Sequence, residues 1–335
     1  MVISGFQELK TQLREAAPQP AVVAAAHDEH TLEAVFQARR DGLISPILVG
    51  DVERIRSIAR SQGEEIPQEA LVQAGGEGEC AQRSVDLIRQ GRGKLLIKGM
   101  LQTGALLRAV VQPDTGIRAS ELLSHVAILD VPTYHKLMFV SDGGMVIAPG
   151  RNQKREILRN VLSLCRFLGY EQPKAAILCA AETVSPRMPE TEDAAALKEE
   201  GVRGDFGPCL VEGPISFDLA TDRAAAEIKG YRSPVAGDAD IFLVPSIAAG
   251  NLMCKALYGM AGGKMAGVVL GPASPSPSTP AAPRRRRNTT PSPSPPPWPS
   301  PLRNQSYCFY HKENRYVLPP LDSEPRLHQH QGRRL

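Results

Sequence analysis

The sequence predicts an α/β protein with mainly parallel sheets, because short apolar runs alternate with amphipathic helical patterns from residue 1 to about 270. Two further observations shape this prediction. The chain has 335 residues, which is long for one domain and fits two of ordinary size. At Gly271 the alternation stops, and the residues that follow are rich in proline, serine and arginine. We therefore expect an α/β body followed by a disordered tail over 272–335.

The first part of the body repeats strand and helix. An amphipathic opening helix at 6–16 precedes Ala21-Val-Val-Ala-Ala-Ala26, which has the composition of a buried strand. Thr103 then stands near the start of a helix that carries Leu106, Leu107, Val110 and Val111. The other expected elements are strands at 44–49 and 94–98 and helices at 30–40, 52–61 and 80–90.

The second part begins with two strands close together, at 126–131 and 136–140, which indicate a hairpin rather than a crossover. Alternation then resumes. Thr191, followed by two acidic residues, is expected to cap the helix that carries 193–200. The remaining expected elements are a helix at 153–168, strands at 175–179, 241–244 and 267–270, and a helix over 252–257.

Charge is distributed unevenly. The tail carries a formal +7 and includes Arg284-Arg-Arg-Arg287, whereas the rest of the chain carries a formal −4. The body thus gives no reason to expect a nucleic-acid partner. The six cysteines form no Cys-x-x-Cys pair and several lie in apolar runs, which favours reduced, buried thiols. No apolar stretch reaches the roughly 18 residues of a membrane span, and no signal-type segment opens the chain. We expect a cytoplasmic protein without a membrane partner.

The segment from Ser233 to Leu257 is the most informative for function. A short apolar run at 241–244 enters a small-residue loop, Ala248-Ala-Gly-Asn251, which opens an apolar helix. Such a junction directs backbone N–H groups beyond the sheet edge, where they suit phosphates. The alternative is an ordinary tight turn between strand and helix.

A second junction lies between Lys98 and Arg108. A strand end, a glycine-bearing turn and a helix start follow one another, with Thr103 near the helix N-terminus. Arg108 falls among leucines, so it either leaves the apolar face or serves a buried anion. Asp142-Gly-Gly-Met145 is a third candidate, a tight turn that lines a cleft or simply closes a hairpin.

Two other motifs favour structural roles. His27-Asp-Glu-His30 has metal-binding residue types, but Asp28 or His30 more simply caps the helix that begins there. The glycine-rich stretch at 259–267 fits neither the Walker nor the dinucleotide spacing. We therefore predict no metal site and no permanently bound cofactor.

Several motifs follow one another in a specific order. They are Thr103-Gly-Ala-Leu-Leu-Arg108, Leu123-Ser-His-Val126, Ser141-Asp-Gly-Gly-Met145, Pro173-Lys-Ala-Ala-Ile-Leu-Cys-Ala-Ala-Glu182, Met188-Pro-Glu-Thr-Glu-Asp-Ala194, Val211-Glu-Gly-Pro-Ile-Ser-Phe-Asp218, Ser233-Pro-Val-Ala-Gly-Asp-Ala-Asp-Ile241 and Gly250-Asn251. In this order they resemble the phosphate acetyl/butyryltransferase family, above all its butyryltransferases, over about residues 5–271.

The resemblance implies a two-domain isocitrate/isopropylmalate dehydrogenase-like fold with an interdomain cleft, and a homo-oligomer. It implies that butyryl-CoA and inorganic phosphate give butyryl phosphate and coenzyme A, by attack of the CoA thiolate on the acyl phosphate. Coenzyme A is then a substrate, and short-chain acyl-CoA, phosphate and acyl phosphate are the partners. Substrate-binding residues are expected at Thr103, Arg108, Gly143, Ser233 and Asn251. The first domain is expected to comprise 1–122 and 262–271, and the second 123–261.

The resemblance ends inside a domain. After this point, members of the family have a strand that ends in Ser-Arg-Gly and then a last helix, with an acidic residue nearby that acts as the base. From Pro272 onward this sequence has no counterpart of the strand, the helix or the acidic base. The catalytic residues are therefore unassigned, and impaired activity is expected. The alternative is a catalytically inactive paralogue that binds CoA or a partner through its Pro/Arg tail. A third hypothesis is a dehydrogenase with the same kind of fold, which the ordered motifs disfavour.

A change of reading frame would account for the tail. Pro280-Ala-Ala-Pro-Arg-Arg-Arg-Arg-Asn288 can be encoded so that, starting from the last base of the Thr279 codon, the same bases read Ser-Arg-Gly-Ala-Ser-Ala-Glu-Glu-Lys. The next eleven codons can then yield an amphipathic helix. We thus predict that residues from about 272 onward are read out of frame.

Overall fold

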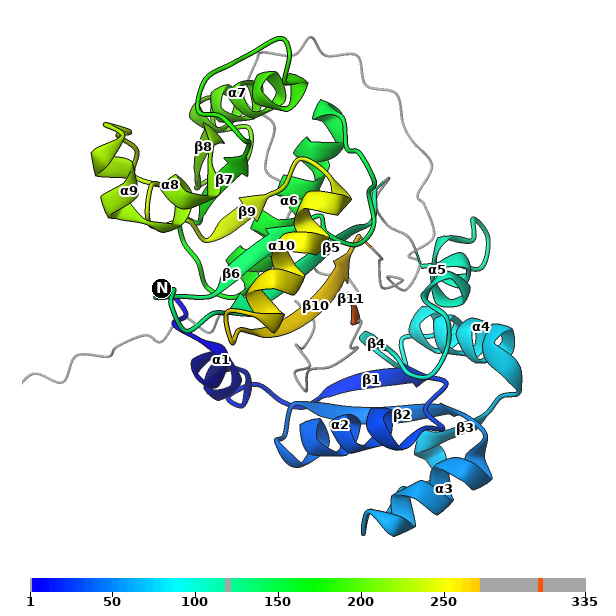
Figure 1. Ribbon diagram of the computed structural model, residues 1–335. Coiled ribbons are helices and arrows are strands. Elements are labelled where there is room, and N and C mark those ends of the chain that lie inside the picture. The colour runs from blue at the N-terminus through cyan, green and yellow to red at the C-terminus, as the bar shows by residue number, and fades with distance from the viewer. Residues whose placement is uncertain (1, 118–121, 272–306, 310–335) are drawn as a thin grey trace, which may run out of the picture.

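The computed structural model describes residues 2–117, 122–271 and 307–309, the last three by their backbone alone. The strands of this part form one mixed sheet of eleven, in the order β3-β2-β1-β4-β11-β10-β5-β6-β9-β7-β8. Figure 1 shows two groups of strands, β1 to β4 and β5 to β10, with β11 between them. The mixed α/β architecture predicted from the sequence is confirmed.

The first group is parallel throughout, since β1 pairs with β2 and β4, and β2 with β3. Helices connect its strands, as the alternating pattern predicts. The elements are α1 (Phe6–Leu13), β1 (Gln19–Ala24), α2 (Glu29–Arg40), β2 (Ile44–Gly50), α3 (Val52–Ser61), a 3-10 turn (Gln68–Ala70), β3 (Leu71–Gln73), α4 (Gly76–Arg89), β4 (Leu95–Lys98) and α5 (Thr103–Val111).

The second group contains the predicted hairpin, because β5 runs antiparallel to β6. β5 also pairs antiparallel with β10, whereas β6, β9, β7 and β8 are parallel to one another. The elements are β5 (Ser124–Asp130), β6 (Met138–Ser141), α6 (Arg151–Phe167), β7 (Lys174–Leu178), α7 (Pro189–Val202), β8 (Leu210–Ile215), α8 (Phe217–Thr221), α9 (Arg223–Ile228), β9 (Ile241–Leu243), α10 (Ile247–Gly259) and β10 (Lys264–Leu270).

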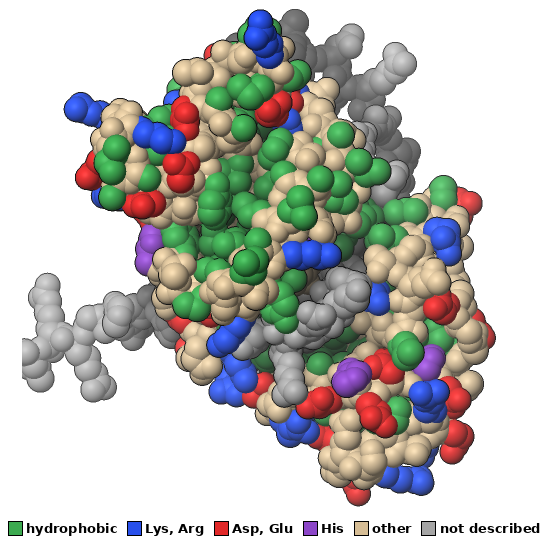
Figure 2. All heavy atoms as spheres, in the orientation of Figure 1, with side chains coloured by type: hydrophobic (Ala, Val, Ile, Leu, Met, Phe, Trp, Pro, Cys, Tyr) green, Lys and Arg blue, Asp and Glu red, His purple; other side chains and the backbone are tan. Residues whose placement is uncertain are grey.

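The two faces of the sheet are covered differently. On one face a single apolar cluster runs across both groups of strands and includes residues of α1, α2, α3, α6 and α7. On the other face there are two clusters, one built with α4 and α5 and the other with α8, α9 and α10. This split face is turned toward the viewer in Figure 1, where α5 and α10 stand apart, and Figure 2 shows hydrophobic side chains over α10.

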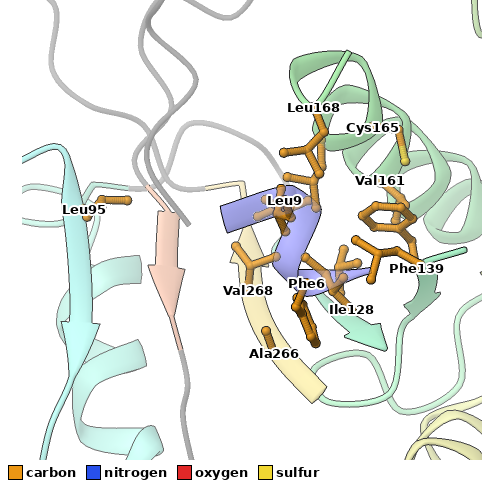
Figure 3. Packing of buried hydrophobic residues seen from close by; sticks show 14 of the residues in the cluster. Phe6, Leu9, Leu95, Ile128, Phe139, Val161, Cys165, Leu168, Ala266 and Val268 are labelled. Atoms are coloured by element: carbon orange, nitrogen blue, oxygen red, sulfur yellow. The ribbon is translucent and has the colours of Figure 1, made fainter. Parts of the chain in front are cut away.

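β11 (Tyr307–Phe309) joins the two groups of strands. It pairs in parallel with β4 and antiparallel with β10, which do not pair with each other. Figure 3 shows Leu95 of β4 on one side of β11, and Phe6 and Leu9 of α1 packed near Val268 of β10 on the other. β11 is an exception to the expectation of a tail without regular structure, and the rest of 272–335 lies outside the described residues.

The cysteines and the helices bear on two further predictions from the sequence. Cys80, Cys165, Cys179, Cys209 and Cys254 are buried and free, as the sequence predicts. Within residues 2–117 and 122–271, no helix is both long enough and apolar enough to cross a membrane.

Candidate active site

The N-terminus of α5 offers hydrogen-bond donors that the rest of the described chain does not use. Thr103 opens the helix, and Gln102 before it supplies no side-chain cap. Among the described residues, neither the Thr103 side chain nor the backbone N–H groups of Thr103 and Gly104 have a hydrogen-bond partner. Free N–H groups at a helix N-terminus attract anions. The junction predicted at 98–108 is thus present and open.

Arg108 lies on the exposed side of α5, so the first of the two alternatives for it, leaving the apolar face, is what the structure shows. Its guanidinium folds back one turn toward the helix start, where a Cβ added at Gly104 would lie 3.6 Å from Nη1. No ion pair or hydrogen bond joins the Arg108 side chain to another described residue. A guanidinium, a hydroxyl and two N–H groups therefore gather at one end of α5.

The loop after β6 meets α10 at very short range. A Cβ added at Gly250 would lie 2.8 Å from Cα of Gly143 and 2.8 Å from Cγ2 of Val244. The side chain of Asn251 is exposed, and its Nδ2 donates to the Gly143 carbonyl at 3.4 Å. Two of the residues predicted to line a cleft, Gly143 and Asn251, are thus in contact.

Replacing Gly250 with alanine is expected to destabilise the fold by about 1–3 kcal/mol, because the new methyl group has no space against Gly143. Gly259 in the same helix has nothing within 4 Å of an added Cβ. Gly259→Ala should therefore be neutral or stabilise the protein by up to about 1 kcal/mol. Chemical denaturation of both variants checks this, and equal effects would contradict the close packing of the loop after β6 against α10.

The other expected contacts differ in outcome. Met145, in the same loop as Gly143, packs against the apolar cluster that contains Leu106 of α5, so this loop reaches the α5 side. Ser233 lies in the segment before β9, where its Oγ accepts a hydrogen bond from Val235 N at 3.2 Å. Among the described residues, no hydrogen bond joins Ser233 to Gly143, Asn251 or α5, and its place in a substrate site stays a prediction.

The prediction of a loop at Ala248-Ala-Gly-Asn251 is wrong. α10 begins at Ile247 behind an N-cap at Ser246, so these residues form its first turns. The N–H of Ile247 donates to the Ile147 carbonyl at 3.0 Å, and those of Ala249 and Gly250 donate to Ser246. This helix start is largely satisfied internally, because Ser246 accepts through both its side chain and its carbonyl. The backbone here does not offer a phosphate the donors that the sequence suggested.

The motif His27-Asp-Glu-His30 has the structural role favoured above. Asp28 caps α2 by accepting from Thr31 N at 2.9 Å. His27 lies between β1 and α2, with its Nδ1 3.5 Å from Asp51 N. No group of three metal-ligating side chains occurs within the described residues.

Sequence reasoning assigned no role to the side chains of Asp142 and His125, which organise this edge of the sheet. The buried Asp142 carboxylate accepts from Gly144 N at 2.7 Å and Met145 N at 2.8 Å through Oδ1, and from His125 N at 3.1 Å through Oδ2. Both residues stand inside quoted motifs, yet only the pairing of β5 with β6 brings them together. A second unforeseen feature is a hollow of about 310 Å³ beside the α5 junction, lined by Ala25, His27, Arg54, Gly76, Glu77 and Met100.

Sequence comparison gives consistent relatives. The family described as phosphate acetyl/butaryl transferase matches residues 77–279. A phosphate butyryltransferase of Clostridium acetobutylicum is 35% identical over 274 residues, which cover 82% of this chain and 91% of that protein. A phosphate acetyltransferase of Rhizobium meliloti is 39% identical over 272 residues, which cover 81% of this chain and 86% of that protein.

Solved structures agree. A branched-chain phosphotransacylase from Enterococcus faecalis V583 superposes with a TM-score of 0.65 at 29% identity, covering 76% of this chain and 89% of that one. A phosphotransacetylase from Streptococcus pyogenes shares the fold, with a TM-score of 0.67 at 18% identity, covering 80% of this chain and 91% of that one. The chain belongs to the phosphate acetyl/butaryl transferase family of acyltransferases.

Proposed function

We propose that this protein transfers a short acyl group between coenzyme A and phosphate, with butyryl-CoA and phosphate giving butyryl phosphate and CoA. The observation that carries the proposal is the open start of α5, where Thr103, Arg108 and free N–H groups present donors to an anion. The names of the relatives, butyryl- and acetyltransferases, support the acyl class. Coenzyme A is a substrate here and not a resident cofactor.

The chemistry assigns roles to these groups. A CoA thiolate adds to the acyl carbonyl carbon, and the bond from that carbon to the phosphate oxygen breaks, so phosphate leaves with the electron pair. Arg108 and Thr103 would hold the phosphoryl group, since charge-assisted hydrogen bonds strengthen as charge develops on it. We propose that Asn251 and Gly143 line the side of the substrate site opposite α5. Ser233, in the segment before β9, is proposed as a further substrate-binding residue.

Replacing Arg108 with alanine tests this assignment. Losing a charge-assisted contact to a desolvated anion costs about 2–5 kcal/mol of binding, roughly 30- to 4,000-fold in phosphate or acyl-phosphate use. The melting temperature should hardly change, because Arg108 is exposed and unpaired among the described residues. Arg60→Ala, on the exposed side of α3, is the control and should alter neither property. Unchanged kinetics with a large loss of stability would assign Arg108 a structural role.

A catalytically inactive paralogue that binds CoA or a partner is the second candidate. The observation that favours it is that no Ser-Arg-Gly motif follows Gly271, so the residues expected to grip the acyl phosphate are missing. Assays of thiol release from butyryl-CoA with phosphate separate the two functions. CoA binding without turnover, in a chain whose frame proves correct, would favour the paralogue.

We also propose a homo-oligomer in the cytoplasm. Leu252 of α10 is 69% exposed, and Met260, which follows the end of α10, is 90% exposed. These side chains form an apolar face that suits contact with a second copy of the chain. Light scattering that returns the monomer mass at working concentration would contradict this, and fractionation tests the location.

The division into domains 1–122 with 262–271, and 123–261, is likewise proposed. The two separate clusters on the split face support it. Limited proteolysis that leaves neither unit intact would contradict it.

A further inference from the structure

His125 stands on the split face of the sheet, between the two apolar clusters. Successive side chains of a strand point to opposite faces, so His125 shares its face with Leu123 and Ala127. Leu123 belongs to the cluster built with α5, and Ala127 to the cluster built with α10. An ionisable ring thus lies between the helix that carries Thr103 and Arg108 and the helix that carries Asn251.

The ring of His125 is fixed by the loop after β6. A Cβ added at Gly144 would lie 2.9 Å from Cγ of His125, so glycine leaves room for the ring. The backbone of His125 is held on both sides, because its N–H donates to Asp142 at 3.1 Å and its carbonyl accepts from Ser141 Oγ at 2.8 Å. These contacts hold the residue in place without occupying its ring nitrogens.

The two ring nitrogens have different surroundings. Nδ1 is enclosed and has no hydrogen-bond partner among the described residues. The residue as a whole is partly exposed, so we take the open edge of the ring to be the one that carries Nε2. A buried N–H without an acceptor is rarer than a buried acceptor without a donor, which places the proton of the neutral ring on Nε2.

The charge of the ring follows from the same setting. Burial lowers the pKa of His125 below its usual value, and the nearby Asp142 carboxylate offsets only part of this. Among the described residues, Asp142 is the charged group that acts on the ring, and its carboxylate already accepts from backbone N–H groups. The ring is therefore neutral at neutral pH and offers a donor at Nε2.

We propose that His125 is a neutral hydrogen-bond donor to the acyl substrate and stabilises the carbonyl oxygen of the group being transferred. This rests on the proposed function. As the CoA sulfur bonds to the carbonyl carbon, the carbonyl electron pair moves to oxygen, and the Nε2–H donates to that oxygen. The pair returns when the bond to phosphate oxygen breaks. His125 keeps its proton throughout, so it is not the base that deprotonates the thiol.

Nitrogen NMR of the 335-residue chain with ¹⁵N-labelled histidine tests the ground state without turnover. We expect the His125 signals, assigned by their loss in His125→Gln, to show a neutral ring protonated at Nε2 at neutral pH. Addition of butyryl-CoA or acetyl phosphate should shift the Nε2 signal. A ring that is protonated on Nδ1, that titrates near its ordinary pKa, or that ignores both ligands would overturn the proposal.

Measurement of kcat gives a second test. It uses the 335-residue chain or, where the turnover of that chain is too slow, the frame-restored chain. His125→Ala should lower kcat by about 10²–10³-fold, as expected for loss of one such donor. His125→Gln keeps an N–H at similar reach and should stay within about tenfold of the wild type. His30→Ala, an exposed residue of α2, is the control. Equal losses in the alanine and glutamine variants, or none in either, would overturn the proposal.

Different results would contradict the proposed function and the proposed role of His125. Absence of turnover in the folded, frame-restored chain with every acyl-CoA would contradict the proposed function, while the NMR result would still decide the tautomer and its contact with ligand. Normal turnover with an unaffected His125→Ala would overturn the role of His125 alone.

Discussion

Restoring the reading frame from about residue 272 is expected to raise both transferase activity and stability. β4 and β10 do not pair with each other, and a strand of three residues, β11, stands between them. The family model matches residues 77–279, so the match stops where the proposed Ser-Arg-Gly reading would begin. A full strand with its helix would bury several aliphatic side chains at about 1.5–3 kcal/mol each. We therefore expect a gain of several kcal/mol in the free energy of unfolding.

The gene sequence decides this first. Codons over Pro280–Asn288 that are incompatible with the Ser-Arg-Gly reading would contradict the proposal. Where they are compatible, the frame-restored and 335-residue chains are compared by thiol release and by chemical denaturation. A control that deletes everything after Gly271 separates the effect of removing the tail from that of adding the strand. Robust activity of the 335-residue chain would also contradict it.

Lys136→Met is expected to destabilise the protein by about 3–5 kcal/mol, because it leaves the buried Asp240 carboxylate without its cation. The Lys136 side chain is 2% exposed and lies just before β6. Its Nζ is 2.8 Å from Asp238 Oδ1 and 2.7 Å from Asp240 Oδ1. Burial tends to raise the pKa of Asp238, but hydrogen bonds from Lys136, Lys174 and His135 more than offset this and lower its pKa.

Lys174→Met is the matched control. Lys174 contacts the same Asp238, but its side chain is 26% exposed and both aspartates keep Lys136. Its loss should cost no more than about 1 kcal/mol, as for an exposed pair. Urea denaturation of both variants measures the difference. Equal losses would contradict the view that Lys136 neutralises the buried Asp240.

The fold was predictable where residues carried a strong local pattern. β1, β2 and β4 are short apolar runs bounded by helical patterns, and the predicted hairpin is β5 with β6. β3 was missed because it has three residues and only Leu71 is buried. β8 was missed because Glu212, Gly213 and Pro214 interrupt its apolar pattern. Such elements depend on their neighbours in the sheet more than on their own composition.

Helix starts were predicted less well. Thr191 was expected to cap α7, but the helix begins at Pro189 and its N-cap is Met188. The Thr191 hydroxyl instead donates to the Met188 carbonyl at 2.7 Å, inside the first turn. Proline is favoured as the first residue of a helix, and this preference prevailed over the threonine signal.

The candidate site was predictable in part. Glycines beside Thr, Ser or Asn marked the strand-to-helix junctions, and the structure brings Gly143 and Asn251 together. The importance of His125 could not be predicted, because it depends on cross-strand pairing and on the space left at Gly144. Register and close packing are properties of the folded sheet, which a single sequence does not state.

Phosphate-dependent release of free CoA from butyryl-CoA tests the central claim most directly. The frame-restored chain, shown to be folded by circular dichroism, should release thiol only when both phosphate and butyryl-CoA are present. The 335-residue chain should do so far more slowly, and Arg108→Ala should abolish most of the rate. A folded, frame-restored chain that releases no CoA in the presence of phosphate, from butyryl-CoA or from shorter and longer acyl-CoA, would contradict the assignment as a phosphate acyltransferase.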